Sequence, residues 1–427
     1  MRLRLTLTVA LLLTAGCTAA PASDHPLAPA TSPSATVRTP TGLQVEAQRH
    51  RIAERIMQRR ERAVRDKDER AFLSTLDVSN TAMVRRQKRL FANLVAMPLR
   101  TFTLHATDAT WPSGFAQDRF RATAYIPYVQ QRLQLRGFDP VPVTTTYGLT
   151  LAPVHGHWKI VSDDDVRARE AEGARDAPWD LTRISVHRTA HALGFFDRGS
   201  EREATSLMQW TEQSVRRVRA EVPLRWPGRV VVYALSDPQV LRALGERMQS
   251  RAAVAFPVLD DNEHPTRRVA TRVVINPRYL PRSELEGTYL LSHEITHVAL
   301  AGTAYGTPAW VQEGLAEYVA TRGGSPSLWY VGPSTAARAR RGVDAMPSST
   351  FFGDQDPAYD YNLSLAAFVS LTDRFGEPKV WSFLKALSRT GSPAHPEGEP
   401  DRVLRRMFHL DSARLAGRAA DVLVARG

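Results

Sequence analysis

Two histidines and a glutamate stand close together in the segment His293-Glu294-Ile295-Thr296-His297. In an α-helix, residues four apart share one face, so His293 and His297 can bind the same metal ion. Glu294 lies beside this pair and can accept a proton from a water molecule that the metal activates. A five-residue motif is short, so the segments around it decide what it means.

The neighbouring residues predict that the motif lies inside a helix. Ser283 followed by Glu286 has the pattern of a capping box, and Gly302 is the expected end of the helix. No proline interrupts the stretch between them. Apolar residues recur there at helical spacing: Leu285, Tyr289, Leu290, Ile295, Val298 and Leu300. We therefore expect a helix that is buried on one side.

A second helix is expected directly downstream. Thr307 and Pro308 have the pattern of an N-cap followed by proline at the first helical position. The helix then carries Glu313 and Glu317, which are four apart and share a face. A catalytic zinc ion commonly takes three protein ligands and leaves one position to water. One of the two acids can complete the set, and the other can hydrogen-bond the far ring nitrogen of a histidine ligand.

These two segments resemble the gluzincins, the thermolysin-like and M1-like branch of zinc peptidases. The motif His-Glu-x-x-His followed by Glu-Gly-Leu-Ala-Glu-Tyr is most similar to the bacterial peptidase MA-like domains. The resemblance implies a zinc metallopeptidase that binds one Zn²⁺ ion through His293, His297 and Glu313. It also implies that Glu294 is the catalytic general base and that Glu317 orients His293. Fifteen residues separate His297 from Glu313, fewer than in thermolysin or M1 enzymes, and nineteen would separate it from Glu317 as the alternative ligand.

The same resemblance implies a donor for the substrate oxyanion. In M1-like enzymes, a tyrosine at the start of a later helix takes this role. We expect a helix from Tyr361 to about Phe375. Tyr361 is therefore the catalytic candidate, and Tyr359 is the reserve. The alternative is that the tyrosine at the helix start only packs against its neighbours.

A strand near the active helix pairs with the substrate in this class, and Val269 to Asn276 is the candidate for that strand. M1 aminopeptidases carry a Gly-x-Met-Glu-Asn strand that none of the residues before His293 matches, so exopeptidase and endopeptidase activity both stay open.

The beginning of the chain has the pattern of an export signal. Met1 to Arg4 is basic, and Leu5 to Leu13 is apolar but too short to span a membrane. The sequence then resembles a bacterial lipobox that ends at Cys17, the only cysteine of the chain. We expect a lipoprotein signal peptide over residues 1–16 and lipidation of Cys17, which would anchor the protein to the bacterial cell membrane on its extracytoplasmic side. The alternative is an ordinary secretory signal.

Composition predicts the next segment and the surface charge. Residues 17–44 are rich in Ala, Pro, Ser and Thr, which is typical of a disordered tether. The formal net charge is +12 and becomes +10 if Arg2 and Arg4 leave with the signal. No motif of a nucleic-acid-binding module is present, so we expect no nucleic-acid partner. Contact with anionic lipid headgroups or envelope polymers is one consequence, and a merely solvated basic surface is the alternative.

The remaining length suggests two α+β domains. Residues 45–166 show helical patterns first and alternating strands afterwards, at residues 121–129, 141–151 and 157–162. This order resembles the NTF2-like or SnoaL-like cone. Residues 178–427 would then form a mainly helical gluzincin-like peptidase domain with a small sheet, which acts on a peptide or protein substrate. A second hypothesis is a non-catalytic envelope lipoprotein in which both domains are binding or scaffold modules.

Overall fold

The computed structural model combines many helices with small sheets, which agrees with the expected α+β class at that coarse level. Within the described residues, no helix combines the length and apolar character that crossing a membrane requires. The predicted signal peptide, Cys17 and most of the tether lie outside these residues. The residues described are 42–165, 177–237, 240, 252–261, 267–304, 306–322, 328–350, 352, 356–391 and 397–427.

The first helix begins earlier than expected. It starts at Gly42, so residues 42–44 are helical and do not belong to a disordered tether. The last proline before it is Pro40, and nothing after that residue prevents the helix from extending toward the N-terminus. The residues from Glu46 to Gly427 form one compact unit.

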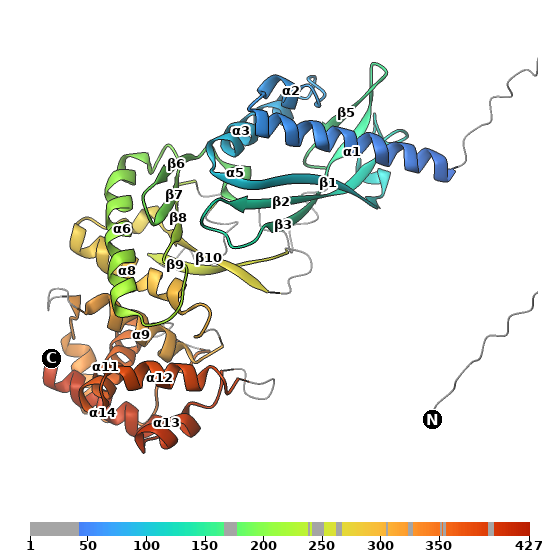
Figure 1. The fold of residues 1–427 in the computed structure, drawn as a ribbon. Coiled ribbons are helices and arrows are strands. Elements are labelled where there is room, and N and C mark those ends of the chain that lie inside the picture. The colour runs from blue at the N-terminus through green and yellow to red at the C-terminus, as the bar shows by residue number, and fades with distance from the viewer. Residues whose placement is uncertain are drawn as a thin grey trace, which may run out of the picture. The chain divides into compact units, whose positions relative to one another are not determined.

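Helices precede strands in the N-terminal part, as expected. The strands β1, β2 and β3 form an antiparallel sheet, and β4 pairs with β5 as a hairpin. Helix α1 lies across the three-stranded sheet (Figure 1) and contacts it through Glu54, whose carboxylate accepts a hydrogen bond from the Ala106 N–H group at 2.9 Å. The elements are α1 Gly42–Asp66, α2 Glu69–Leu73, α3 Thr81–Ala96, β1 Leu99–Trp111, η1 Ser113–Phe115, β2 Ile126–Leu135, β3 Val143–Gly148, β4 Thr150–Val154 and β5 His157–Ser162.

Two strand predictions in this part were wrong. The strand expected at residues 121–129 begins only at Ile126, because turns with hydrogen bonds to the Phe120 carbonyl occupy the residues before it. The strand expected at residues 141–151 is divided into β3 and β4 at Leu149. Strand β1 was not predicted. An NTF2-like cone stays a prediction.

A five-stranded sheet in the C-terminal part has the order β6-β7-β8-β10-β9. The three central strands β7, β8 and β10 are parallel to one another, and α6 connects β7 to β8. The outer strands β6 and β9 each run antiparallel to their neighbour. The elements are α5 Pro178–Leu181, β6 Ser185–Arg188, β7 Ala192–Phe196, η2 Glu201–Glu203, α6 Ala204–Glu221, β8 Val230–Ala234, β9 Ala253–Leu259 and β10 Arg268–Ile275.

This topology corrects the expected substrate-pairing strand. The segment Val269 to Asn276 corresponds to β10, which is paired on both sides and therefore has no free edge. The sheet ends at β6 on one side and at β9 on the other; β9 is the edge strand that contacts α8, and it was not predicted. Edge position is a property of tertiary pairing, so neither strand's hydrophobic pattern could distinguish them.

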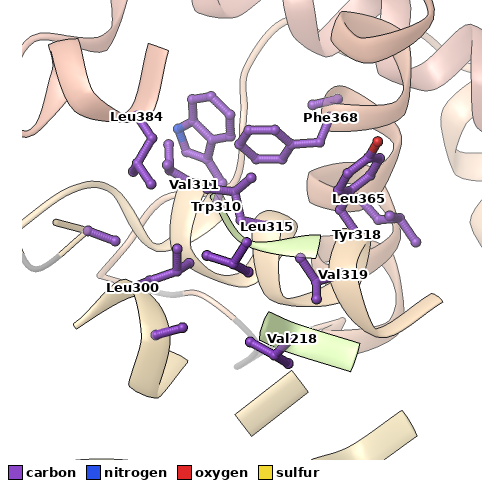
Figure 2. Close-up of a cluster of buried hydrophobic side chains, with 14 of the residues drawn as sticks. Val218, Leu300, Trp310, Val311, Leu315, Tyr318, Val319, Leu365, Phe368 and Leu384 are labelled. Atoms are coloured by element: carbon purple, nitrogen blue, oxygen red, sulfur yellow. The ribbon is translucent and has the colours of Figure 1, made fainter. Parts of the chain in front are cut away.

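Helices make up most of the remaining chain, and α9, α11, α12, α13 and α14 gather together (Figure 1). Helix α9 is central to this group, since Trp310, Val311, Leu315 and Val319 all point into the largest hydrophobic core (Figure 2). The elements are η4 Pro277–Tyr279, α8 Glu284–Leu300, α9 Ala309–Thr321, α10 Pro333–Arg340, α11 Pro357–Phe375, α12 Glu377–Leu387, α13 Pro400–Phe408 and α14 Ser412–Arg426.

The two expected domains share buried contacts. One hydrophobic cluster joins Phe91 and Leu94 of α3 to Phe195 of β7. A buried ion pair also links Arg272 of β10 to Asp139, with side-chain exposures of 4% and 1%. The division into residues 45–166 and 178–427 stays a prediction, and these contacts would form its interface.

Removing the charge of Asp139 should destabilise the protein strongly. The substitution Asp139→Asn leaves Arg272 charged and buried without a carboxylate partner, which should lower the free energy of unfolding by about 3 kcal/mol. The measurement is urea unfolding of the full chain. In the control Asp118→Asn, the substituted side chain is 87% exposed, so its ion pair with Arg121 should contribute less than about 1 kcal/mol. Equal effects of the two substitutions would contradict the prediction.

Candidate metal centre

Helix α8 begins with the predicted serine cap. The Ser283 hydroxyl accepts a hydrogen bond from the Glu286 N–H group at 3.2 Å. The Glu286 carboxylate accepts from the Arg282 N–H group at 2.9 Å, one residue before the expected partner. The helix ends at Leu300. The motif therefore lies well inside the helix, as expected.

The start of α9 differs by one residue from the prediction. Pro308 is the N-cap, in an extended conformation with ψ 148°, and the helix begins at Ala309. The Thr307 hydroxyl donates to the Ala304 carbonyl at 2.7 Å and does not cap the helix. The first helical N–H group, of Ala309, instead donates to the Ser349 hydroxyl at 2.8 Å. A cap from a residue this distant in sequence leaves no local signal.

Gly314 allows α9 to pack closely on α11. A Cβ atom at this position would lie 2.6 Å from the Ser364 carbonyl oxygen and 2.7 Å from the Phe368 ring. Such distances are too short for any side chain, so only glycine fits. The close approach fixes α11 next to the helix that carries Glu313 and Glu317.

Three donor atoms converge from α8 and α9. The Nε2 atom of His293 lies 3.1 Å from both the Nε2 atom of His297 and the Oε2 atom of Glu313, and the latter two atoms lie 3.3 Å apart. Tetrahedral zinc with bonds of about 2.0–2.1 Å places neighbouring ligand atoms about 3.3–3.4 Å apart. The triangle therefore has the dimensions of one face of a zinc tetrahedron. Among the described residues, this is the cluster able to hold a metal ion.

Glu317 contacts the far side of the first histidine. Its Oε1 atom lies 3.0 Å from the Nδ1 atom of His293, although the ring N–H direction is not aligned with that oxygen. A proton on Nδ1 would leave a lone pair on Nε2, and this lone pair would face the Glu313 carboxylate. Two such groups repel each other unless a positive charge lies between them. The donor set therefore fits a bound cation.

The pKa shifts of His293 and Glu313 agree with a positive charge between these groups. Burial alone would lower the pKa of His293, but its contacts with Glu313 and Glu317 raise the pKa well above its ordinary value. Burial alone would raise the pKa of Glu313, yet the two histidines lower it overall. Without a metal ion, the cluster holds a proton on His293; with one, the ion supplies that positive charge.

Glu294 is the second buried acid next to the histidines, with a residue exposure of 6%. Burial raises its pKa, while the charges of His293 and His297 and the backbone of Ala255 in β9 partly offset the rise. A carboxylate with a raised pKa, beside the two histidines and the edge strand β9, is suited to accept a proton and to return it.

The cluster lies in a cleft of about 1080 Å³ between β9, α8, α9 and α11. Tyr361 lines this cleft, and its ring centre is 6.0 Å from that of His293. It lies in the second turn of α11, which begins at Pro357 and not at Tyr361 as expected. The reserve candidate, Tyr359, is buried under the Arg338 guanidinium and does not line the cleft. The structure thus brings Tyr361 to the cluster.

No family model and no curated protein matches the sequence. A two-domain M1 zinc metallopeptidase mutant bound to L-arginine matches with a TM-score of 0.30 and 15% identity over 56% of this chain and 51% of that one. A second mutant structure, from Deinococcus radiodurans, matches with a TM-score of 0.32 and 15% identity over 72% and 62%. Both similar structures are M1 zinc metallopeptidases. This chain spans less than two thirds of either, and at such scores the likeness supports no conclusion about its activity.

Two features of the site were missed in the sequence. One is β9, and the other is Tyr289, whose hydroxyl donates to the Oε2 atom of Glu317 at 2.6 Å. Tyr289 is four residues before His293, so helical spacing alone would have placed both on one face. It was interpreted only as part of an apolar stripe.

Zinc affinity should fall at acidic pH. Zinc must displace the proton on His293, whose pKa is raised well above 6.5. Below that pKa, each lower pH unit should weaken apparent binding at least about tenfold, and above it binding should level off. A chelator competition between about pH 6 and pH 8 measures this. The control His187→Gln, whose imidazole contacts Glu201 outside the cluster, should keep the same slope; a pH-independent affinity would contradict the prediction.

Proposed function

We propose that the protein is a zinc-dependent peptidase. The observation that carries this proposal is the triangle of donor atoms from His293, His297 and Glu313, with edges of 3.1–3.3 Å, in residues that line a cleft. Glu294 lies beside the triangle, as hydrolysis by an activated water requires. A mere packing of polar residues would not need three inward-facing donor atoms and a general base in one cleft.

A zinc ion held by His293, His297 and Glu313 would supply the Lewis acid that polarises the attacking water and the substrate carbonyl. The Glu294 carboxylate accepts a proton from the attacking water and passes it to the leaving nitrogen. Glu317 holds the ring of His293 through Nδ1. The Tyr361 hydroxyl donates a hydrogen bond to the carbonyl oxygen as negative charge develops on it.

The edge strand β9 is the proposed docking site for the peptide backbone. Ala253, Ala255 and Pro257 of this strand line the cleft. An extended peptide can pair with such an edge through main-chain hydrogen bonds, which suits substrates whose side chains vary. Strand β9 contains no acidic residue that could pair with a free substrate N-terminus.

The proposed cellular position rests on the sequence alone. Lipidation at Cys17 would hold the peptidase on the extracytoplasmic face of the membrane, since several acyl chains anchor stably. The basic surface would favour anionic headgroups or envelope polymers nearby. The substrate would then be a peptide or an envelope protein.

The substitution Glu294→Gln should separate chemistry from metal binding. The amide cannot accept the proton of water, so peptide hydrolysis should fall at least about 100-fold while zinc stays bound. The measurement is the cleavage of a peptide library together with metal analysis. The matched substitution Glu313→Gln should lose zinc as well as activity. Cleavage that survives Glu294→Gln would contradict the mechanism, and zinc binding without any cleavage would favour the binding-module hypothesis.

The substitution Tyr361→Phe should lower kcat with little change in KM. It removes a donor that acts on the oxyanion, and the loss of such a donor costs about 10²–10³ in rate. The control Tyr359→Phe removes a hydroxyl outside the cleft and should leave both constants near those of the wild type. Equal effects of the two substitutions would show that Tyr361 only packs against its neighbours.

A further inference from the structure

Three side chains form a chain of contacts that leads away from the metal ligands. The Tyr289 hydroxyl donates to the Oε2 atom of Glu317 at 2.6 Å. The other carboxylate oxygen of Glu317, Oε1, lies 3.0 Å from the Nδ1 atom of His293. Tyr289 and His293 are one turn apart on α8, whereas Glu317 comes from α9. The two oxygens of Glu317 therefore connect two residues of the neighbouring helix.

Glu317 depends on this arrangement because of its surroundings. Its residue exposure is only 8%, and two further acids, Glu294 and Glu313, lie in the same cluster. A buried carboxylate needs hydrogen-bond donors to stay charged and fixed. If Oε2 loses the Tyr289 donor, the carboxylate is free to turn away from His293. That rotation would weaken its contact with the Nδ1 atom of the ring.

The hydroxyl of Tyr289 donates its hydrogen bond to Glu317. Tyr289 lines the cleft, so its hydroxyl could in principle serve the substrate oxyanion instead. A phenol has one O–H proton, and in the structure that proton is donated to Glu317. Burial and the charge of Glu317 also raise the pKa of Tyr289, so the hydroxyl keeps its proton. We therefore do not assign the Tyr289 hydroxyl to the substrate oxyanion.

We propose that Tyr289 is a positioning residue of the metal centre, acting through Glu317 on His293. The proposal rests on the proposed zinc-dependent function and goes beyond it, because it assigns a role to a residue that binds neither zinc nor substrate. Outer hydrogen-bond partners of this kind fix the tautomer and orientation of a ligand histidine and raise its basicity.

The test is the zinc affinity of Tyr289→Phe, measured on the full chain by competition with a chromophoric chelator at constant pH. The affinity should fall about 10–100-fold, as is typical when an outer partner of a ligand histidine is removed. The variant should still bind one zinc ion at saturation. The control Tyr318→Phe makes the same change beside Glu317 on α9, where the hydroxyl accepts a hydrogen bond from Arg322 at 2.9 Å. Its zinc affinity should stay within about twofold of the wild type.

A double-mutant cycle with Glu317→Gln tests the route of the effect. If Tyr289 acts through Glu317, the double variant should bind zinc no more weakly than Glu317→Gln alone. Additive losses would overturn the proposal, because Tyr289 would then act on the site by another route. A folded Tyr289→Phe protein with wild-type zinc affinity would also overturn it.

The outcomes distinguish this proposal from the proposed function. A wild-type chain that binds zinc and cleaves peptides, together with an unaffected Tyr289→Phe variant, would refute only the positioning role. A wild-type chain that binds no zinc would refute the proposed function and the positioning role together. Thermal unfolding of each variant establishes that a loss of affinity does not come from misfolding.

Discussion

Three electron-rich atoms converge in the interior of the protein, and this convergence constrains the structure around it. The two Nε2 atoms of His293 and His297 and the Oε2 atom of Glu313 lie within 3.3 Å of one another. Such an arrangement is stable only with a positive charge at its centre, either a proton or a metal ion. The packing of α8 against α9, and the close approach of α9 to α11 at Gly314, bring the atoms together.

The groups around the triangle of donor atoms lie on two sides of it. On one side, the Tyr289 hydroxyl donates a hydrogen bond to Glu317, whose other carboxylate oxygen lies 3.0 Å from the Nδ1 atom of His293. On the other side, Glu294 faces the cleft and the edge strand β9, where burial raises its pKa. The two carboxylates therefore have different surroundings: Glu317 accepts a hydrogen bond from Tyr289, whereas burial raises the pKa of Glu294.

The cluster of His293, His297 and Glu313 could be expected from the sequence because it depends on helical spacing within two short segments. Helical spacing places His293 and His297 on one face, and the same spacing relates Glu313 to Glu317. Features that depend on distant residues could not be predicted: the cap of α9 comes from Ser349, and the place of β9 at the end of the sheet, among the described strands, results from tertiary pairing. The helices of the N-terminal part were expected, but β1 was missed and β2 begins later than predicted. The roles of the site residues and the lipid anchor stay predictions.

Anomalous X-ray diffraction at the zinc absorption edge tests the central claim most directly. Crystals of the protein grown with zinc should show one strong peak at about 2.0–2.2 Å from the Nε2 atoms of His293 and His297 and from a carboxylate oxygen of Glu313. Glu317 should lie outside bonding distance of that peak. The absence of a peak in the cleft, or a peak bonded to Glu317 in place of Glu313, would contradict the account.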